Sequence, residues 1–451
     1  MQLSEITRML EGRLIGADAS FQGVSLNSRT IQPDQLFIAY KGKNADGHDF
    51  LDEAKERGAI GALVLHPVES TLPQVVVHDI RMSLGEIASY YRQQLTMPII
   101  ALTGSCGKTT TKTLIAKILS KVGKVHSTEG TLNNDYGMPL TLLNASKKDK
   151  FVVLEMGANH PQEIAYLTYI ARPTIALITN AGPVHLEGFK DIQGVARAKG
   201  EIFQGLAQNG VAIINIDDVF GQYWQEIAAG NPYITFGLNT RADVYADQIQ
   251  VHSDGSTTFH LHTLSGSGQV NLALIGKHNI MNALAATAVG IAAGASTEQI
   301  CAGLSEVISV DKRLMPRVGL NGMTIIDDTY NANPRAMEIA VDVLMELAGE
   351  KVFVTGDMGE LGAEAVKFHR QLGEMARLAG VNRLYAVGEL SLHTAEAFGE
   401  KGYHFHDQAA LIEALQVELK PNICMLVKGS RSAKMENVVQ ALLPKTETHL
   451  C

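Results

Sequence analysis

The sequence predicts an α/β protein of three domains: a small α/β domain, a central domain built on a parallel sheet, and a C-terminal Rossmann-like domain. The chain has 451 residues, and roughly 150 residues per domain give three domains. Two long stretches alternate buried-type strands with helical patterns, which is typical of parallel sheets covered by helices on both faces. Hydrophobic residues make up 46% and charged residues 19%, so the chain has the apolar material for several cores and is not mainly disordered.

We assign the first domain to residues 1–82. Short apolar runs divided by turn residues lie at 36–40, 60–65 and 75–77. One helical stretch, 51–58, lies among them. Short strands with a single helix predict a small α/β domain.

We assign the central domain to residues 83–312, with a helix over 83–95 leading into it. A strand at 97–103 is followed by a glycine-containing loop and by a helix that starts near Lys108. Further buried-type strands are expected at 151–155, 174–179 and 211–216. Helical stretches between them predict a parallel sheet with helices on both faces.

An antiparallel insertion is expected over 242–274, where the apolar period changes to two, and a helix over 279–293 closes the central domain. The third domain is assigned to residues 313–451. Its expected strands are 324–327, 352–355, 383–387 and 423–427. Because a helical pattern follows each strand, we expect a second doubly wound unit.

Charge and cysteine content exclude several classes of protein. With 38 basic and 47 acidic residues the net charge is −9, so we expect no nucleic-acid partner and no attraction to an anionic membrane. The N-terminal residues lack the features of a secretory signal, and the most apolar window, 280–295, falls short of the ~20 apolar residues that span a bilayer. The four cysteines show no CxxC spacing. We therefore expect a cytoplasmic protein that is not integral to a membrane.

The stretch Thr103-Gly-Ser-Cys-Gly-Lys-Thr-Thr110 is the most informative local pattern. It follows an apolar strand and opens a helix, which is the context of a phosphate-binding loop (P-loop). Small residues let backbone N–H groups approach phosphate oxygens, and the helix N-terminus adds partial positive charge. The expected nucleotide contacts are Gly104, Ser105, Cys106, Gly107, Lys108, Thr109 and Thr110. The alternative is a strand-to-helix turn that happens to contain a lysine. Because Leu102 stands where the common form of the loop has glycine, ordinary GTPases and motor ATPases fit less well.

Two other strand ends carry candidate metal ligands, Glu155 and His185. Ligands of open α/β sheets gather beyond the carboxyl ends of the strands, so both side chains can face the same crevice as the P-loop. A carboxylate suits Mg²⁺, whereas a lone histidine suits it poorly and would more often be structural. Lys199 lies on a predicted helix, and its spacing does not distinguish it from a solvated lysine.

Further motifs run along almost the whole chain. In the first domain they lie at 27–29, 36–37, 41–42 and 46–50. In the central domain they lie at 103–110, 133–139, 155–157, 185–187, 198–201 and 276–282. In the third domain they are Asp327-Asp-Thr-Tyr-Asn-Ala-Asn-Pro334, Gly356-Asp-Met-Gly-Glu-Leu-Gly362 and Val427-Lys-Gly-Ser-Arg431. The set resembles the Mur ligase family, and the third-domain motifs resemble its members that join D-alanyl-D-alanine to UDP-N-acetylmuramoyl-tripeptide.

The resemblance implies a division of labour among the domains. The first would hold the UDP end of the substrate, the central one ATP, and the third the incoming dipeptide. The implied activity is ATP-dependent amide-bond formation through an acyl phosphate, which makes the pentapeptide precursor of peptidoglycan for cell wall biogenesis. The implied cofactors are ATP and two Mg²⁺ ions, the implied partners are small-molecule substrates, and we expect a monomer.

On the nucleotide side, the resemblance implies roles at matching positions. Lys108 and Thr109 match phosphate and Mg²⁺ contacts, and Glu155 and His185 match metal ligands. Lys199 matches a lysine that is carbamylated, which gains a carboxylate able to support the second metal ion. Asn279 and Asn282 match adenine-side positions, Asp328 a ribose-side position, and Arg313 an arginine that reaches the phosphates. We expect Lys108, Lys199, His185 and Arg313 to be catalytic.

On the substrate side, the resemblance places Asn133 and Asn134 near the muramoyl peptide. Contacts of the first domain are expected at Asn27, Ser28, Arg29, Lys41, Asp46 and His48. Contacts of the third domain are expected at Tyr330, Asn331, Asn333, Lys428 and Arg431.

Three positions depart from the family pattern. Thr329 stands where serine is common, and Cys106 stands for asparagine, serine or threonine, so its side chain is not expected to bind phosphate. The usual Gly-Arg before the third domain is Lys312-Arg313 here. Arg317 is a rival for the phosphate role, and we prefer Arg313 because its distance to the two aspartates at 327–328 fits the family better.

Other functions stay open at this point. One is another ligase of the superfamily, such as a diaminopimelate- or lysine-adding ligase or a folylpolyglutamate synthase. Asn333-Pro-Arg335 is similar to the D-N-P-R motif of the former only by coincidence, and the latter lacks an N-terminal UDP domain. A P-loop binding protein that uses ATP as a switch is a different class. The sequence does not decide whether the acceptor peptide ends in diaminopimelate or lysine.

Overall fold

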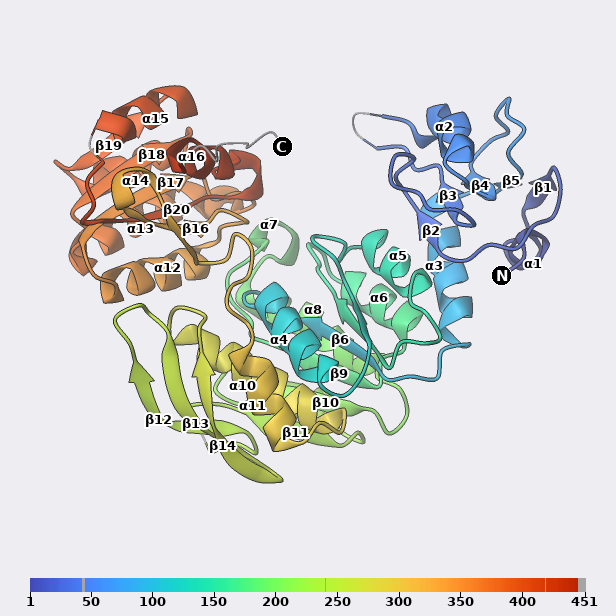
Figure 1. Ribbon diagram of the computed structural model, residues 1–451, viewed down its shortest axis with the longest axis horizontal. Coiled ribbons are helices and arrows are strands. Elements are labelled where there is room, and N and C mark those ends of the chain that lie inside the picture. Colours follow the sequence, from blue (N-terminus) through green and yellow to red (C-terminus); the bar gives the residue numbers. More distant parts are fainter. Residues whose placement is uncertain (43–44, 240, 418, 445–451) are drawn as a thin grey trace, which may run out of the picture.

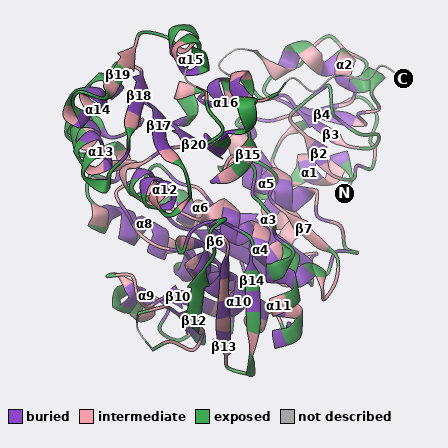
Figure 2. Cartoon of the chain, turned by 60° about the vertical axis from the view of Figure 1, so that its left-hand side comes forward, coloured by how far each residue is buried: buried purple, intermediate pink, exposed green. Residues whose placement is uncertain are grey.

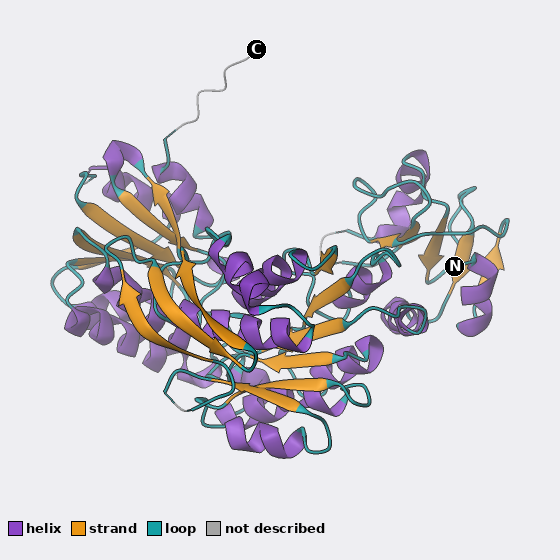
Figure 3. Cartoon of the chain, turned by 60° about the horizontal axis from the view of Figure 1, so that its bottom comes forward, coloured by secondary structure: helices purple, strands orange, loops and turns teal. Residues whose placement is uncertain are grey.

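The computed structural model describes residues 1–42, 45–239, 241–417 and 419–444, and these residues form four sheets (Figure 1). Three α/β units follow one another along the chain, so the predicted three-domain α/β architecture is confirmed. The N-terminal and C-terminal units lie on opposite sides of the central unit (Figure 3). Within the described ranges, no helix has both the length and the apolar character needed to cross a bilayer.

The N-terminal unit is a five-stranded sheet in the order β1-β5-β4-β3-β2, in which only β1 runs antiparallel to its neighbour. Its elements are α1 (Leu3–Met9), β1 (Arg13–Ile15), β2 (Val24–Ser25), β3 (Leu36–Ile38), α2 (Leu51–Glu56), β4 (Gly61–Val64) and β5 (Gln74–Val76). The three predicted apolar runs form β3, β4 and β5. The pattern missed β1, β2 and α1, which are short.

Helix α3 (Ile80–Arg92) joins the N-terminal and central units. It starts three residues before the predicted helix because the Asp79 side chain accepts a hydrogen bond from the Met82 N–H at 2.8 Å. The expected domain boundary after residue 82 therefore falls inside this helix. Its Tyr91 hydroxyl donates to the carbonyl of Ala145 at 2.7 Å, so α3 is fixed to the central unit.

The central unit holds a six-stranded, fully parallel sheet in the order β11-β10-β9-β6-β8-β7. Its strands are β6 (Ile99–Thr103), β7 (Val125–Ser127), β8 (Phe151–Glu155), β9 (Ile175–Ile178), β10 (Val211–Asn215) and β11 (Tyr233–Phe236). Its helices are α4 (Lys108–Ser120), α5 (Gly137–Leu143), α6 (Glu163–Ala171), α7 (Leu186–Phe189), α8 (Ile192–Gln204), α9 (Gly221–Ile227), α10 (His278–Ala292) and α11 (Thr297–Ser305).

Alternate residues of β6 point to opposite faces of the central sheet, and both faces are buried (Figure 2). Ile99 and Ala101 pack into the core that contains α6 and α8, whereas Ile100 and Leu102 pack into the core that contains α4 and α10. This double burial produces the continuous apolar run from which the strand was predicted.

The predicted antiparallel insertion is a three-stranded sheet, β12 (Tyr245–Val251), β13 (Thr257–Thr263) and β14 (Gly266–Leu272).

The third unit is a six-stranded sheet in the order β15-β16-β20-β17-β18-β19, and β15 alone is antiparallel to its neighbour. Its elements are β15 (Met315–Val318), β16 (Thr324–Asp328), α12 (Pro334–Glu346), β17 (Glu350–Gly356), α13 (Ala365–Ala379), β18 (Arg383–Val387), α14 (Ser391–Phe398), β19 (Gly402–Phe405), α15 (Gln408–Val417), β20 (Ile423–Lys428) and α16 (Glu436–Leu442). The four predicted strands are β16, β17, β18 and β20.

Candidate active site

One cavity of about 930 Å³ lies between the central and third units. The P-loop, the end of β8 and the start of α10 line it from the central unit, and the loops after β16, β17 and β20 line it from the third. It therefore collects the carboxyl ends of strands from two sheets, which is where open α/β sheets bind ligands.

The P-loop conformation depends on two glycines. Gly107 precedes α4 with φ +80°, and a Cβ there would lie 2.3 Å from Asn282 Oδ1. A Cβ on Gly104 would lie 1.9 Å from Thr179 Oγ1. Because no side chain caps α4, its first N–H groups are available to an anion. The Thr179 hydroxyl donates to the carbonyl of Cys106 at 2.7 Å and holds the loop in place.

Lys108 extends back over the P-loop, and its Nζ donates to the carbonyl of Gly104 at 2.7 Å. Burial lowers the pKa of Lys108, while the charge of Glu155 opposes that shift. Its ammonium lines the cavity beside the N-terminus of α4, where an anion would be bound by both.

Glu155 ends β8 and is only 1% exposed. Its Oε1 accepts hydrogen bonds from Asn133 Nδ2 at 2.9 Å and from the Thr109 hydroxyl at 3.3 Å. Its Oε2 is buried without a hydrogen-bond partner and lies 3.7 Å from Lys112 Nζ. The Glu155 carboxylate and the Thr109 hydroxyl supply the oxygen donors that a hard divalent cation prefers, so these residues fit Mg²⁺. Across the described ranges, no three His, Cys, Asp or Glu side chains converge on one metal position.

His185 also lines the cavity and lies in the left-handed region, with φ +48°. Its Nδ1 contacts a carboxylate oxygen of Glu360, which comes from the loop after β17 in the third unit. Burial lowers the pKa of His185, and the Glu360 carboxylate opposes the shift. The structure therefore ties the expected metal ligand to a third-unit residue that the sequence analysis did not single out.

Lys199 lies on α8 and is 1% exposed, so the alternative of a solvated helix lysine is wrong. Its Nζ lies 5.4 Å from the centroid of the Phe189 ring. Burial, and secondarily the charge of Lys108, lowers the pKa of Lys199 to about 7. Lys199 is not among the residues that line the cavity.

Asn279 and Asn282 line the cavity at the start of α10, where Asn282 lies beside the P-loop residue Gly107. The Asn279 amide donates to the carbonyl of Ile275, and the Asn282 amide donates to Asn279 Oδ1, both at 2.8 Å. His278 also lines the cavity, and burial lowers its pKa to about 4. His278 belongs to the motif at 276–282, but nothing in the sequence pattern pointed to a role for it.

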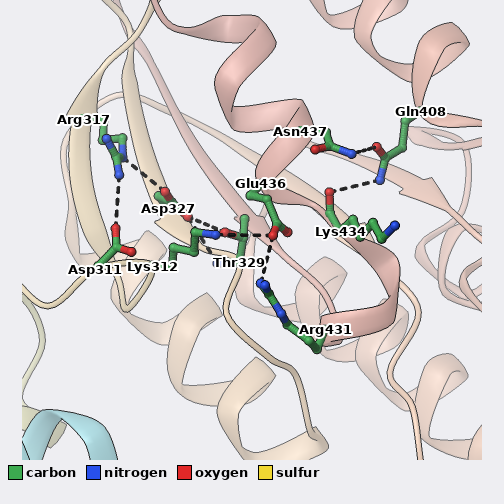
Figure 4. Close-up of polar contacts among 10 residues, drawn as sticks. All are labelled: Asp311, Lys312, Arg317, Asp327, Thr329, Gln408, Arg431, Lys434, Glu436 and Asn437. Atoms are coloured by element: carbon green, nitrogen blue, oxygen red, sulfur yellow. Dashed lines mark hydrogen bonds and ion pairs between the residues drawn. The ribbon is translucent and has the colours of Figure 1, made fainter. Parts of the chain in front are cut away.

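Arg313 lines the cavity and belongs to the joining segment, residues 306–314, which connects α11 of the central unit to β15 of the third unit. Its guanidinium lies 3.7 Å from the centroid of the Tyr330 ring and 3.5 Å from the Thr109 hydroxyl. Arg317 instead pairs with the buried Asp327 at 3.1 Å and with Asp311 at 3.5 Å, and it does not line the cavity (Figure 4). The geometry therefore favours Arg313 over its rival.

The third-unit candidates also gather at the cavity. Asp328 accepts from Lys428 Nζ at 2.6 Å and from the Leu314 N–H at 3.2 Å. Asn333 caps α12, and its amide nitrogen lies 3.7 Å from Cys106 Sγ in the P-loop. The cavity is lined by Asn133, Asn134, Asp328, Tyr330, Asn331, Asn333, Lys428 and Arg431.

The N-terminal candidates lie outside this cavity. His48 bridges the Asp46 carboxylate at 2.6 Å and the Leu65 N–H at 3.0 Å, and Lys41 lies 3.7 Å from Asp46. Asn27, Ser28 and Arg29 form a second group, in which the Ser28 hydroxyl donates to Glu53 at 2.7 Å and Asn27 Oδ1 accepts from the Arg29 N–H at 2.9 Å. Arg81 and Tyr166 line the cavity, and no pattern in the sequence pointed to them.

Comparison with known proteins agrees with this arrangement. Residues 20–103 match the catalytic domain of the Mur ligase family, 102–290 the Mur ligase middle domain, and 313–431 the Mur ligase glutamate ligase domain. A UDP-N-acetylmuramoyl-tripeptide–D-alanyl-D-alanine ligase of Escherichia coli K12 is 45% identical over 445 residues, 98% of each chain. This chain belongs to the Mur ligase family.

Solved structures of Mur ligases have the same fold. MurF from Acinetobacter baumannii is 35% identical and matches with a TM-score of 0.89 over 97% of each chain. MurF ligase from Thermotoga maritima, in complex with ADP, is 29% identical and matches with a TM-score of 0.80 over 93% of this chain and 96% of that one. A folylpolyglutamate synthase from Mycobacterium tuberculosis is 16% identical with a TM-score of 0.64, over 80% of this chain and 94% of that one, so this likeness shows the fold alone.

Proposed function

We propose that this Mur ligase uses ATP to join D-alanyl-D-alanine to UDP-N-acetylmuramoyl-tripeptide, which makes the pentapeptide precursor of peptidoglycan. The observation that carries the proposal is a single cavity lined both by the P-loop and by the motifs of the third unit, at 328–333 and 428–432. The relative of 45% identity bears the name of this activity over the full length of the chain. The location proposed for this reaction is the cytoplasm, and one chain is proposed to be sufficient because one chain completes the cavity.

The chemistry explains why a nucleotide site and a dipeptide site share one cavity. A carboxylate does not acylate an amine directly, because oxide is a poor leaving group. The tripeptide carboxylate therefore attacks the γ-phosphorus of ATP, ADP leaves, and an acyl phosphate forms. The dipeptide amine then attacks the acyl carbon, and phosphate leaves from the tetrahedral intermediate.

The residues around the cavity position these groups and neutralise phosphoryl charge. Lys108 and the first N–H groups of α4 bind the outer phosphates, and Arg313 reaches them from the third unit. Asn279 and Asn282 bind the adenine, Asp328 the ribose, and Arg431 the dipeptide. The first-unit residues Asn27 to Arg29, Lys41, Asp46 and His48 hold the UDP end, at a distance from the cavity.

Glu155 and the Thr109 hydroxyl would hold Mg²⁺, which supplies positive charge to the phosphates when bound. Carbamylation of Lys199 would turn its cationic end into a carboxylate, and His185 would complete the second metal site. Both roles rest on the resemblance to the family and on the burial of Lys199 near Lys108.

The test is the release of ADP and phosphate by the purified protein. We expect release only when Mg²⁺, ATP, the UDP-linked tripeptide and D-alanyl-D-alanine are present together. Equal turnover with free diaminopimelate or lysine, or with glutamate and a folate, would replace this proposal by another ligase. Tight ATP binding without turnover under any of these conditions would indicate a nucleotide switch.

A further inference from the structure

The segment that joins the central and third units has an unusual backbone. Lys312 has φ +54° and Leu314 has φ +45°, on either side of Arg313. Left-handed conformations cost residues with a Cβ about 1 kcal/mol or more. Contacts elsewhere in the structure must therefore hold Lys312 in this conformation.

The side chain of Lys312 provides one such contact. Its Nζ lies 3.3 Å from Oε1 of Glu436, the first residue of α16. The same oxygen accepts a hydrogen bond from Arg431 NH1 at 2.8 Å, so two cations converge on it (Figure 4). The other oxygen, Oε2, is buried and has no hydrogen-bond partner. Partial burial raises the pKa of Glu436, but backbone hydrogen bonding and the two cations outweigh it and lower the pKa overall.

Arg431 depends on this carboxylate for its position. Its side chain is 59% exposed, whereas that of Glu436 is 19% exposed. Among the described residues, its hydrogen bonds to the rest of the third unit are the one within the Glu436 ion pair and that of its backbone N–H, which lies 3.4 Å from Asn331 Oδ1. An exposed guanidinium with one anchor loses its orientation when that anchor loses its charge.

We propose that Glu436 is a positioning residue that ties the joining segment, through Lys312, to Arg431 and so presents Arg431 to the carboxylate of the incoming dipeptide. The proposal rests on the proposed function, because it takes Arg431 as a dipeptide contact. Glu436 itself does not line the cavity, so it acts through Arg431 rather than on the substrate.

The experiment measures KM for D-alanyl-D-alanine and kcat in Glu436→Gln, Lys312→Asn and the double variant. Asparagine tolerates left-handed backbone, so Lys312→Asn removes the cation without adding strain. We expect Glu436→Gln to raise the dipeptide KM about tenfold and Lys312→Asn about threefold, with kcat and the KM for ATP changed less than about twofold. The double variant should resemble Glu436→Gln alone, because both changes break one link. Glu396→Gln, in an exposed ion pair with His393 on α14, is the matched control and should behave as the parent.

Several results would overturn the proposal. An unchanged dipeptide KM in Glu436→Gln with a lower melting temperature means that Glu436 only stabilises the N-terminus of α16. If the dipeptide KM of the double variant rises by the product of the two single-variant factors, Lys312 and Arg431 are not linked. If Glu436→Gln does not fold, an unchanged KM in Lys312→Asn contradicts the link by itself. A parent protein without dipeptide-dependent ADP release refutes the proposed function and this inference together, whereas an active parent with unaffected variants refutes only the inference.

Discussion

The carbamylation of Lys199 can be tested through pH and carbon dioxide. Carbamate formation joins the neutral amine to CO₂ and releases a proton, so it needs a deprotonated lysine. The pKa of Lys199 is lowered to about 7, mainly by burial and then by the charge of Lys108. As the pH falls through 7, the amine becomes protonated and the carbamate can no longer form, so activity that depends on it should fall in the same range.

The shift is large enough to matter. At pH 8 a lysine with a pKa of about 7 is roughly 90% neutral, whereas one at the ordinary value of 10.5 is about 0.3% neutral. The buried amine is therefore about 300 times more available to CO₂ than an ordinary lysine. An uncarbamylated, protonated Lys199 would instead add positive charge behind a metal site, which is electrostatically unfavourable.

The assay is ADP release between pH 6 and 9, in CO₂-depleted buffer and with added bicarbonate. We expect depletion to lower the activity of the parent, bicarbonate to restore it, and ¹³C-labelled bicarbonate to give a carbamate signal. Lys199→Ala should lose most activity and the signal, with partial rescue by a small carboxylic acid. The exposed Lys117→Ala on α4 is the control and should respond as the parent does. A fully active Lys199→Ala variant, or a parent indifferent to CO₂ that shows no label, would refute the reasoning.

Three further predictions concern the cavity. Lys108→Ala should lower kcat about a thousandfold, because it removes the positive charge that stabilises the transferring phosphoryl group, and it should leave the melting temperature unchanged. Near-parental turnover at saturating Mg²⁺ would mean that the site is misplaced. Gly107→Ala should lower the free energy of unfolding by about 2 kcal/mol and weaken ADP binding in calorimetry, because its Cβ would lie 2.3 Å from Asn282 Oδ1 at φ +80°. Arg313→Ala should lower kcat about a hundredfold without unfolding the protein. Arg317→Ala should leave kcat within about threefold but lower the free energy of unfolding in urea by about 3 kcal/mol, because the buried carboxylate of Asp327 loses its cation. The reverse pattern would exchange the roles of the two arginines.

Several elements of the fold could be predicted from local patterns because burial on both faces leaves a clear signal. Strands such as β6 and β8 are continuous apolar runs, and the change to period two marked the insertion of β12 to β14. The strands that the pattern missed, β1, β2, β7, β11, β15 and β19, are two to four residues long and lie at sheet edges. Edge strands bury less of their surface, so their composition resembles that of loops. Short strands at sheet edges are therefore defined by their partners rather than by their own residues.

In the candidate site, too, some features could be predicted from local sequence and others depend on the tertiary structure. The P-loop and Glu155 could be located from the sequence because a loop between a strand and a helix needs small residues, a lysine and a hydroxyl in a fixed order. The low pKa of Lys199 could not be predicted from the sequence, because it results from burial and from the charge of Lys108, which lies 91 positions earlier in the chain. The same holds for Lys312, whose ion-pair partner, Glu436, lies more than a hundred residues later in the chain. Local order along the chain determines which chemistry a loop can carry, but burial and charge are sums over neighbours from distant segments, and only the tertiary structure decides which neighbours those are.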